Sequence, residues 1–153
     1  MRVLSILLIP FLAVLCMGCN EDGGNEPIPH LAGIIGGESW EYKYVKSNFN
    51  SLDNVYDAEV FGEQQSENDP CSIFISGEAH LAIQVPSTPG TYFIPSDINL
   101  IFEQSGVDNT SFTATSGTVE VVGVLDGIVS VYIQADYDES NHVEGSVQFR
   151  KCN

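Results

Sequence analysis

Four cysteines are the residues of this chain whose chemistry is easiest to constrain. Cys16 and Cys19 lie three positions apart in "LCMGCNED", with an apolar run before them and acids after them. Cysteines so close together could bind a metal ion, join a disulfide framework, or mark a point of cleavage and attachment. Cys71 and Cys152 lie far downstream, so the pairing depends on which cysteines remain in the mature chain.

The first 18 residues have the layout of a secretory signal. Arg2 gives a positive start, and an almost uninterrupted apolar run fills residues 3–15. This run is shorter than the roughly 20 apolar residues that a membrane-spanning helix needs. We therefore predict that residues 1–18 are a signal peptide, which would remove Cys16 and leave Cys19 as the first residue.

Export of the chain would leave only Cys71 and Cys152 to pair with each other. Disulfides persist in oxidising compartments, so a bond between these two residues is the simplest prediction. Closing the long loop between them is worth roughly 4 kcal/mol in the chain-entropy model.

The chain is strongly acidic, with 21 Asp and Glu against 5 Lys and Arg and a formal net charge of −16. Such a surface repels phosphate groups, so we expect no nucleic-acid partner. Two interpretations of the acidity remain open. It either keeps a secreted domain in solution, or it gives affinity for cations or for a basic partner.

Short strands separated by turn residues fill the chain after a polar tether. Residues 19–32, which include "NEDGGNEPIPH", combine acids, glycines and prolines without hydrophobic periodicity and predict a flexible tether. Residues 33–153 alternate apolar and polar positions, with Gly, Pro, Asp or Asn about every 8 to 12 residues. We predict an all-β domain, a single antiparallel β-sandwich or barrel of about nine or ten short strands.

Particular strands and turns follow from the alternation. "WEYKYV" predicts one strand at residues 40–45, with Trp40, Tyr42 and Tyr44 on its buried face. Gly77 and Glu78 suit a tight hairpin between "SIFIS" and "AHLAIQV". The stretch "DESN" predicts a second hairpin near the end of the chain.

No catalytic motif occurs in the chain. The histidines His30, His80 and His142 form no metal-binding spacing, and neither Gly-x-Ser-x-Gly nor Ser-x-x-Lys is present. We therefore expect a protein that is not an enzyme and has no cofactor. A hydrolase whose site is assembled from distant residues remains an alternative.

One acidic cluster offers oxygen ligands for calcium. Asp136 and Asp138 stand at alternate positions, and Glu144 follows. The stretch lacks the glycine and the last glutamate of an EF-hand loop, so only a calcium site of another type fits. The alternative is an acidic hairpin turn, which is the commoner use of Asp and Asn.

An aromatic side chain on a wet strand face could stack on a sugar ring. Tyr132 is the best candidate, because the alternation places it opposite a valine face. Trp40, Tyr42 and Tyr137 are the other candidates, although a lone tryptophan in a small β-domain is more often part of the core. Tyr132 therefore carries the prediction of a carbohydrate-binding face.

Gly18 and Cys19, after the short apolar segment, resemble a bacterial lipobox, with Cys16 where leucine is usual. The resemblance implies lipidation and acylation of Cys19 after removal of the signal. Several acyl chains on one residue give lasting membrane anchorage. Asn20, Glu21 and Asp22 resemble the acidic export signal of Bacteroidota lipoproteins, which implies display at the surface of the outer membrane.

The rest of the chain resembles the small all-β lipoproteins of the Bacteroidota. The resemblance rests on "GGESWEY", "PGTYFIP", "SGTVEVVGV" and "YDESNHVEGSVQFRKC". It implies a lipid-anchored envelope protein with a non-enzymatic binding or structural domain, whose partners are the membrane, through the anchor, and an envelope protein or a glycan. A carbohydrate- or calcium-binding surface module is the main alternative.

Overall fold

The computed structural model describes residues 29–63, 71, 77–104 and 110–152. These residues form eleven strands and no helix. All the paired strands are antiparallel, and they make two separate sheets. The prediction of an all-β domain is confirmed, and of its two alternatives the sandwich is the one observed.

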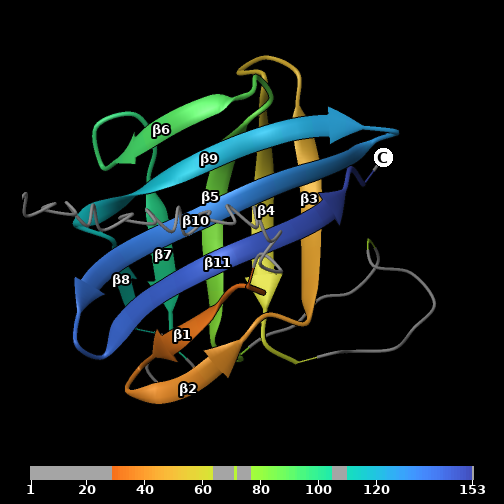
Figure 1. Ribbon diagram of the computed structural model, residues 1–153. Coiled ribbons are helices and arrows are strands. Elements are labelled where there is room, and N and C mark those ends of the chain that lie inside the picture. Colours follow the sequence, from red (N-terminus) through yellow and green to blue (C-terminus); the bar gives the residue numbers. More distant parts are fainter. Residues whose placement is uncertain (1–28, 64–70, 72–76, 105–109, 153) are drawn as a thin grey trace, which may run out of the picture.

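Sheet A contains six strands and sheet B contains five (Figure 1). In spatial order, sheet A consists of β2 (Glu38–Glu41), β1 (Ala32–Ile35), β11 (Asn141–Arg150), β10 (Ile128–Asp138), β9 (Ser116–Leu125) and β6 (Gly90–Ile94). Sheet B consists of β3 (Tyr44–Asn50), β4 (Val55–Phe61), β5 (His80–Pro86), β7 (Leu100–Glu103) and β8 (Ser111–Thr113).

The two sheets face each other with their strands crossing steeply. In Figure 1 the long strands β9, β10 and β11 run across the view in front of β3, β4, β5 and β7, which run up it. Sheets packed in this way meet at corners, where the chain passes from one sheet to the other. Side chains from both sheets come together at such corners.

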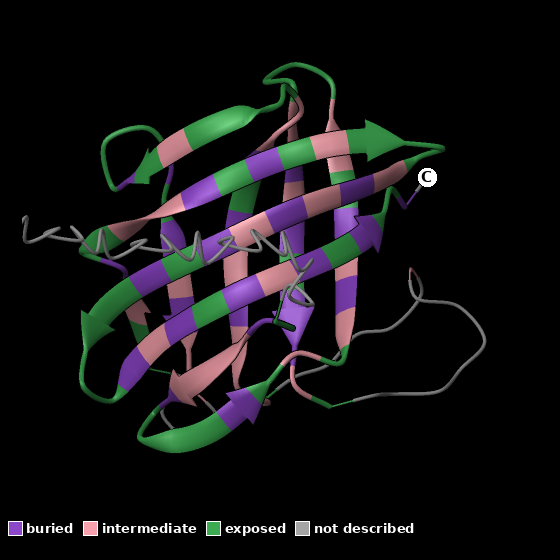
Figure 2. Cartoon of the chain, viewed as in Figure 1, coloured by how far each residue is buried: buried purple, intermediate pink, exposed green. Residues whose placement is uncertain are grey.

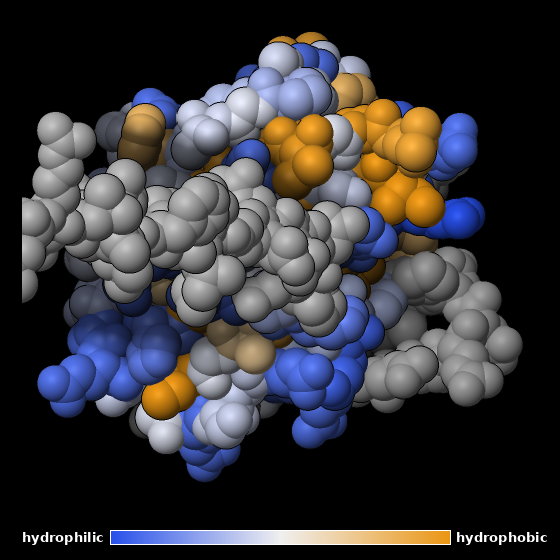
Figure 3. Space-filling view, in the orientation of Figure 1, coloured by the Kyte–Doolittle hydropathy of each residue, from blue (hydrophilic) through white to orange (hydrophobic). Residues whose placement is uncertain are grey.

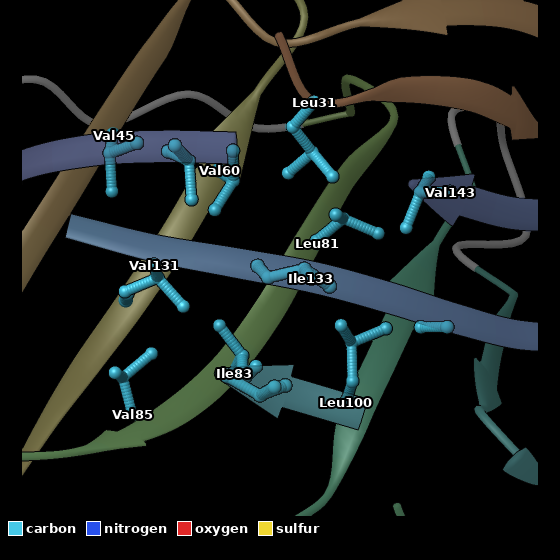
Figure 4. Close-up of a cluster of buried hydrophobic side chains, with 14 of the residues drawn as sticks. Leu31, Val45, Val60, Leu81, Ile83, Val85, Leu100, Val131, Ile133 and Val143 are labelled. Carbon is cyan, nitrogen blue, oxygen red and sulfur yellow. The ribbon is translucent and has the colours of Figure 1, made fainter. Parts of the chain in front are cut away.

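The core lies between the sheets and is built from the alternation seen in the sequence. Along β9, β10 and β11 buried and more exposed residues follow one another (Figure 2). Val131, Ile133 and Val143 of sheet A face a set of aliphatic side chains from sheet B (Figure 4). The interior is almost wholly apolar, with aliphatic side chains in the majority, so its stabilisation comes mainly from removing apolar area from water.

The predicted strand at 40–45 is wrong, because the chain changes sheets within it. The Tyr42 N–H donates to the Leu31 carbonyl beside sheet A, at 2.9 Å, whereas the Lys43 N–H donates to Phe61 of sheet B, at 2.8 Å. The alternation therefore shifts by one residue, and Val45 is buried in place of Tyr44. Trp40 is buried, as the core interpretation predicts.

The turn predictions have different outcomes. Asp138 pairs with Asn141 across a tight turn between β10 and β11, so this hairpin is confirmed. The first arm of the predicted hairpin at Gly77 and Glu78 falls on 72–76, outside the described residues.

The folded domain begins slightly before residue 33, where the predicted tether ends. Leu31 is already fully buried, and β1 begins at Ala32.

Close approach of β1 to β11 requires a glycine at position 33. A Cβ at Gly33 would lie 2.0 Å from the backbone oxygen of His142, well inside van der Waals contact. We expect Gly33→Ala to lower the free energy of unfolding by about 1–3 kcal/mol, measured by urea denaturation.

Gly123→Ala is the matched control, since a Cβ at Gly123 would meet no atom within 4 Å. This variant should stay within about 0.5 kcal/mol of the wild type. Equal stability of the two alanine variants would contradict the observed pairing of β1 with β11.

Candidate functional site

The end of β11 joins sheet A to sheet B at one corner of the sandwich, which we call the β3–β11 corner. Beyond Arg150 the chain passes beside β3, where Asn48 and Cys152 form a parallel bridge. The Cys152 N–H donates to the Ser47 carbonyl at 2.8 Å. Ser47 is fully buried, and its hydroxyl donates to the Arg150 carbonyl at 2.7 Å. These bonds fix the backbone of both strands at the corner.

The disulfide predicted from the cysteine count lies at this corner. Cys71 and Cys152 are bonded, with their Cα atoms 5.4 Å apart. Cys152 is buried and Cys71 is half-buried. The corner is therefore held by a covalent link in addition to its hydrogen bonds.

An open pocket of about 360 Å³ lies at the β3–β11 corner. Its walls come from the crossover into β3, the start of β10, the end of β11 and the disulfide. The lining residues are Tyr42, Lys43, Tyr44, Val45, Cys71, Ile128, Gln148, Phe149 and Arg150. This set contains two phenols, one amide and two basic side chains, and it contains no acid.

Apolar surface adjoins one side of the pocket. Val122, Val124 and Leu125 are exposed near the turn between β9 and β10, where Figure 3 shows a hydrophobic area. Leu125 pairs with Ile128, which lines the pocket. A ligand in the pocket would meet an apolar rim on this side and polar groups elsewhere.

Three of the four basic side chains around the corner have a partner. Lys43 forms an ion pair of 2.6 Å with Glu41, whose carboxyl pKa this hydrogen bond and charge hold below its ordinary value. The Lys46 ammonium nitrogen lies 3.9 Å from a carboxylate oxygen of Glu59, which is a second ion pair.

The other two basic residues, at the end of the chain, differ from each other. The Lys151 ammonium lies 4.7 Å from the centre of the Phe49 ring, in a cation–π contact. Arg150 is exposed, and among the described residues its guanidinium makes neither a hydrogen bond nor an ion pair. Arg150 is thus the basic group of the pocket that remains available to a ligand.

The three residues suggested for calcium are not brought together. Asp136 is exposed on β10 opposite His142, and Glu144 pairs with Gln134. Asp138 instead closes the hairpin turn, where its carboxylate accepts bonds from the next residues of the chain. Within the ranges that the structure describes, no three His, Cys, Asp or Glu side chains group to hold a metal ion.

Tyr132 is half-buried on the outer face of sheet A, opposite the valine face as predicted. Its hydroxyl donates a short hydrogen bond to the Glu144 carboxylate, and this bond raises the pKa of the phenol. The hydroxyl is therefore occupied, although part of the ring remains accessible. Whether this face binds a sugar stays a prediction.

A polar cluster lies near the start of β5. The His80 ring stacks on Phe61, and its Nδ1 lies 2.9 Å from the Glu78 carbonyl oxygen. Burial raises the pKa of the Glu78 side chain, and the nearby Glu63 carboxylate raises it further, whereas a backbone hydrogen bond from Glu63 and the charge of His80 oppose the rise. This carboxylate weakens the fold at neutral pH because the folded state disfavours its charged form.

The pocket was not predicted from the sequence. The sequence nevertheless contains one indication of it, which is the position of the basic residues. Outside the first 18 residues they occur only at 43, 46, 150 and 151. The predicted lipidation site, Cys19, lies outside the described residues, and so does the predicted signal peptide, residues 1–18.

Comparison of the chain with protein-family models, with curated proteins and with solved structures found no match. No helix suited to crossing a membrane occurs in the part of the chain that the structure describes.

Removal of the disulfide should destabilise the domain without changing its fold. We expect the double variant Cys71→Ser with Cys152→Ser to lose about 4 kcal/mol of unfolding free energy, because its unfolded chain gains loop entropy. Urea denaturation followed by far-UV circular dichroism measures this loss. Reduction of the wild type with dithiothreitol is the control and should give the same midpoint as the double variant. An unchanged midpoint in both would contradict a stabilising bond.

Glu78→Gln should stabilise the protein at neutral pH. A carboxyl whose pKa is raised on folding stabilises the fold below its ordinary pKa of 4.5 and loses that contribution as the pH rises through its folded pKa. The variant should therefore melt at a higher temperature than the wild type at pH 7, with the difference vanishing below about pH 4. Glu139→Gln, at an exposed turn position, controls for the loss of one negative charge. A difference that does not depend on pH would contradict the assignment.

Proposed function

We propose that this protein is a lipid-anchored protein of the outer membrane, displayed at the cell surface, whose β-sandwich is a non-enzymatic binding module. The anchor is the acylated Cys19, and the acids that follow it belong to the export signal and the tether. The partners are the membrane, through the lipid, and an envelope glycan or protein that contacts the β3–β11 corner.

The observation that carries the binding part of the proposal is the pocket at this corner. Its volume of about 360 Å³ falls within the range of about 300–1,000 Å³ that is usual for small-molecule sites. The disulfide and the buried Ser47 hydroxyl hold its walls, so little conformational entropy is lost when a ligand binds.

The chemistry of the walls supports binding better than catalysis. Hydrolysis by a nucleophile requires a base within hydrogen-bond reach of a hydroxyl or thiol. The described wall offers phenols, an amide and a guanidinium, which are groups that orient a ligand. We therefore assign the pocket to recognition.

Cys19→Ala tests the anchor. The wild type should sediment with the outer membrane and incorporate an alkyne-labelled palmitate, whereas the alanine variant should lose the label and leave the membrane fraction. Several acyl chains bind a bilayer far more strongly than the polar domain can, so the expected change is from almost fully bound to almost fully released.

Cys16→Ala is the matched control, because it replaces the neighbouring cysteine inside the predicted signal peptide. It should remain lipidated and membrane-bound. Protease treatment of intact cells then separates surface display from a periplasmic location. A Cys19→Ala protein that still sediments with the membrane would overturn the proposed anchor.

A further inference from the structure

The basic residues of this acidic chain are gathered at a single place. Outside the predicted signal the chain has Lys43, Lys46, Arg150 and Lys151 against 21 acids. Lys43 precedes β3 and Lys46 lies within it, whereas Arg150 ends β11 and Lys151 follows it; these segments meet at the β3–β11 corner. An anion that approaches the domain is repelled by most of the surface and attracted only near this corner.

The charge of the pocket wall also differs in sign from the net charge of the chain. Among the lining residues that the structure describes, two are basic and none is acidic, in a chain with more than four times as many acids as bases. Lys43 is already neutralised by its ion pair with Glu41. Arg150 therefore supplies the net positive charge of the pocket wall.

Arg150 is held in a way that suits recognition. Its backbone carbonyl accepts the buried Ser47 hydroxyl, and its Cα pairs with Ile128 of β10. The disulfide at Cys152 lies two residues further on. The backbone is thus fixed while the guanidinium remains without a partner among the described residues, and a guanidinium binds a carboxylate or sulfate through two parallel hydrogen bonds.

The other walls suit a sugar ring. Tyr42 and Tyr44 contribute phenols, whose flat faces can contact the apolar side of a pyranose. The Gln148 amide donates to the Ser130 hydroxyl at 3.1 Å, which orients its carbonyl oxygen as an acceptor for a hydroxyl group. The pocket volume lies at the small end of the range for ligand sites, which matches a monosaccharide or a disaccharide.

We propose that the β3–β11 corner pocket binds an acidic sugar, with its carboxylate or sulfate on the Arg150 guanidinium and its ring against the tyrosines. This inference rests on the proposed binding function and names its ligand class. The carboxylate and the sulfate share one recognition chemistry, and the experiment distinguishes them.

The test is titration calorimetry of the full-length lipidated protein in detergent with three matched probes. D-Galacturonic acid, D-galactose 6-sulfate and D-galactose share one ring and differ only at carbon 6. The corresponding glucose series covers the other common ring configuration. We expect at least one acidic sugar to bind about tenfold or more tightly than its neutral partner, and this preference should weaken as NaCl is added.

Arg150→Gln should abolish the preference for the acid and leave the affinity for the neutral sugar unchanged. Lys151→Gln is the matched control, since it removes the same charge from the adjacent residue, which does not line the pocket. Its affinities should stay within about twofold of the wild type, because a charge exposed to solvent and salt acts weakly at a distance. Circular dichroism and melting temperature verify that both variants fold.

Each contrary outcome points to a different failure. Equal binding of neutral and acidic sugars, lost on Tyr42→Ala, would overturn the acidic class while leaving the binding function intact. Sodium sulfate that binds as tightly as galactose 6-sulfate would overturn the role of the sugar ring. Binding of no probe would overturn this inference, whereas the anchor is decided separately by the Cys19→Ala fractionation.

Discussion

The buried hydrogen bond from the Ser47 hydroxyl to the Arg150 carbonyl joins the two sheets at the corner on which the candidate site depends. Ser47 is fully buried, so an unpaired hydroxyl there would carry a desolvation cost of about 1–3 kcal/mol. The bond satisfies both partners and sets the position of β11 against β3. The disulfide from Cys71 to Cys152 closes the same corner covalently. The pocket and its basic wall exist because these contacts hold sheet A and sheet B together at this point.

The corner also explains how an acidic domain can offer a site for an anion. The acids that the structure describes are distributed over the outer faces and turns of both sheets, whereas the basic side chains converge where the sheets meet. Three of the four basic residues are engaged by Glu41, Glu59 or the Phe49 ring. The fourth, Arg150, has a fixed backbone and a guanidinium that no described residue engages, which distinguishes a recognition group from a surface charge that only improves solubility.

Several features of the fold could be predicted because they depend on short-range patterns. The alternation of valines along β10 identified its buried face correctly, with Tyr132 on the opposite face. The aspartate and asparagine of the last hairpin turn were also identified, since their side chains satisfy turn backbone locally. The strand at 40–45 failed for the opposite reason. Its aromatic alternation is regular, but the chain changes sheets between Tyr42 and Lys43, and no local preference records such a change.

The sequence by itself determined the β-class of the domain, the pairing of Cys71 with Cys152 and the excess of acids over bases. These follow from periodicity, from the two cysteines that the predicted signal cleavage and lipidation would leave to pair, and from composition. Only the tertiary structure decided that β3 and the end of β11 meet, since Ser47 and Arg150 are 103 residues apart in the chain. The pocket depends on that long-range contact, which arises from the crossing of two sheets over a shared aliphatic core. Alternation specifies which face of a strand is buried, whereas packing specifies which strands become neighbours at a corner.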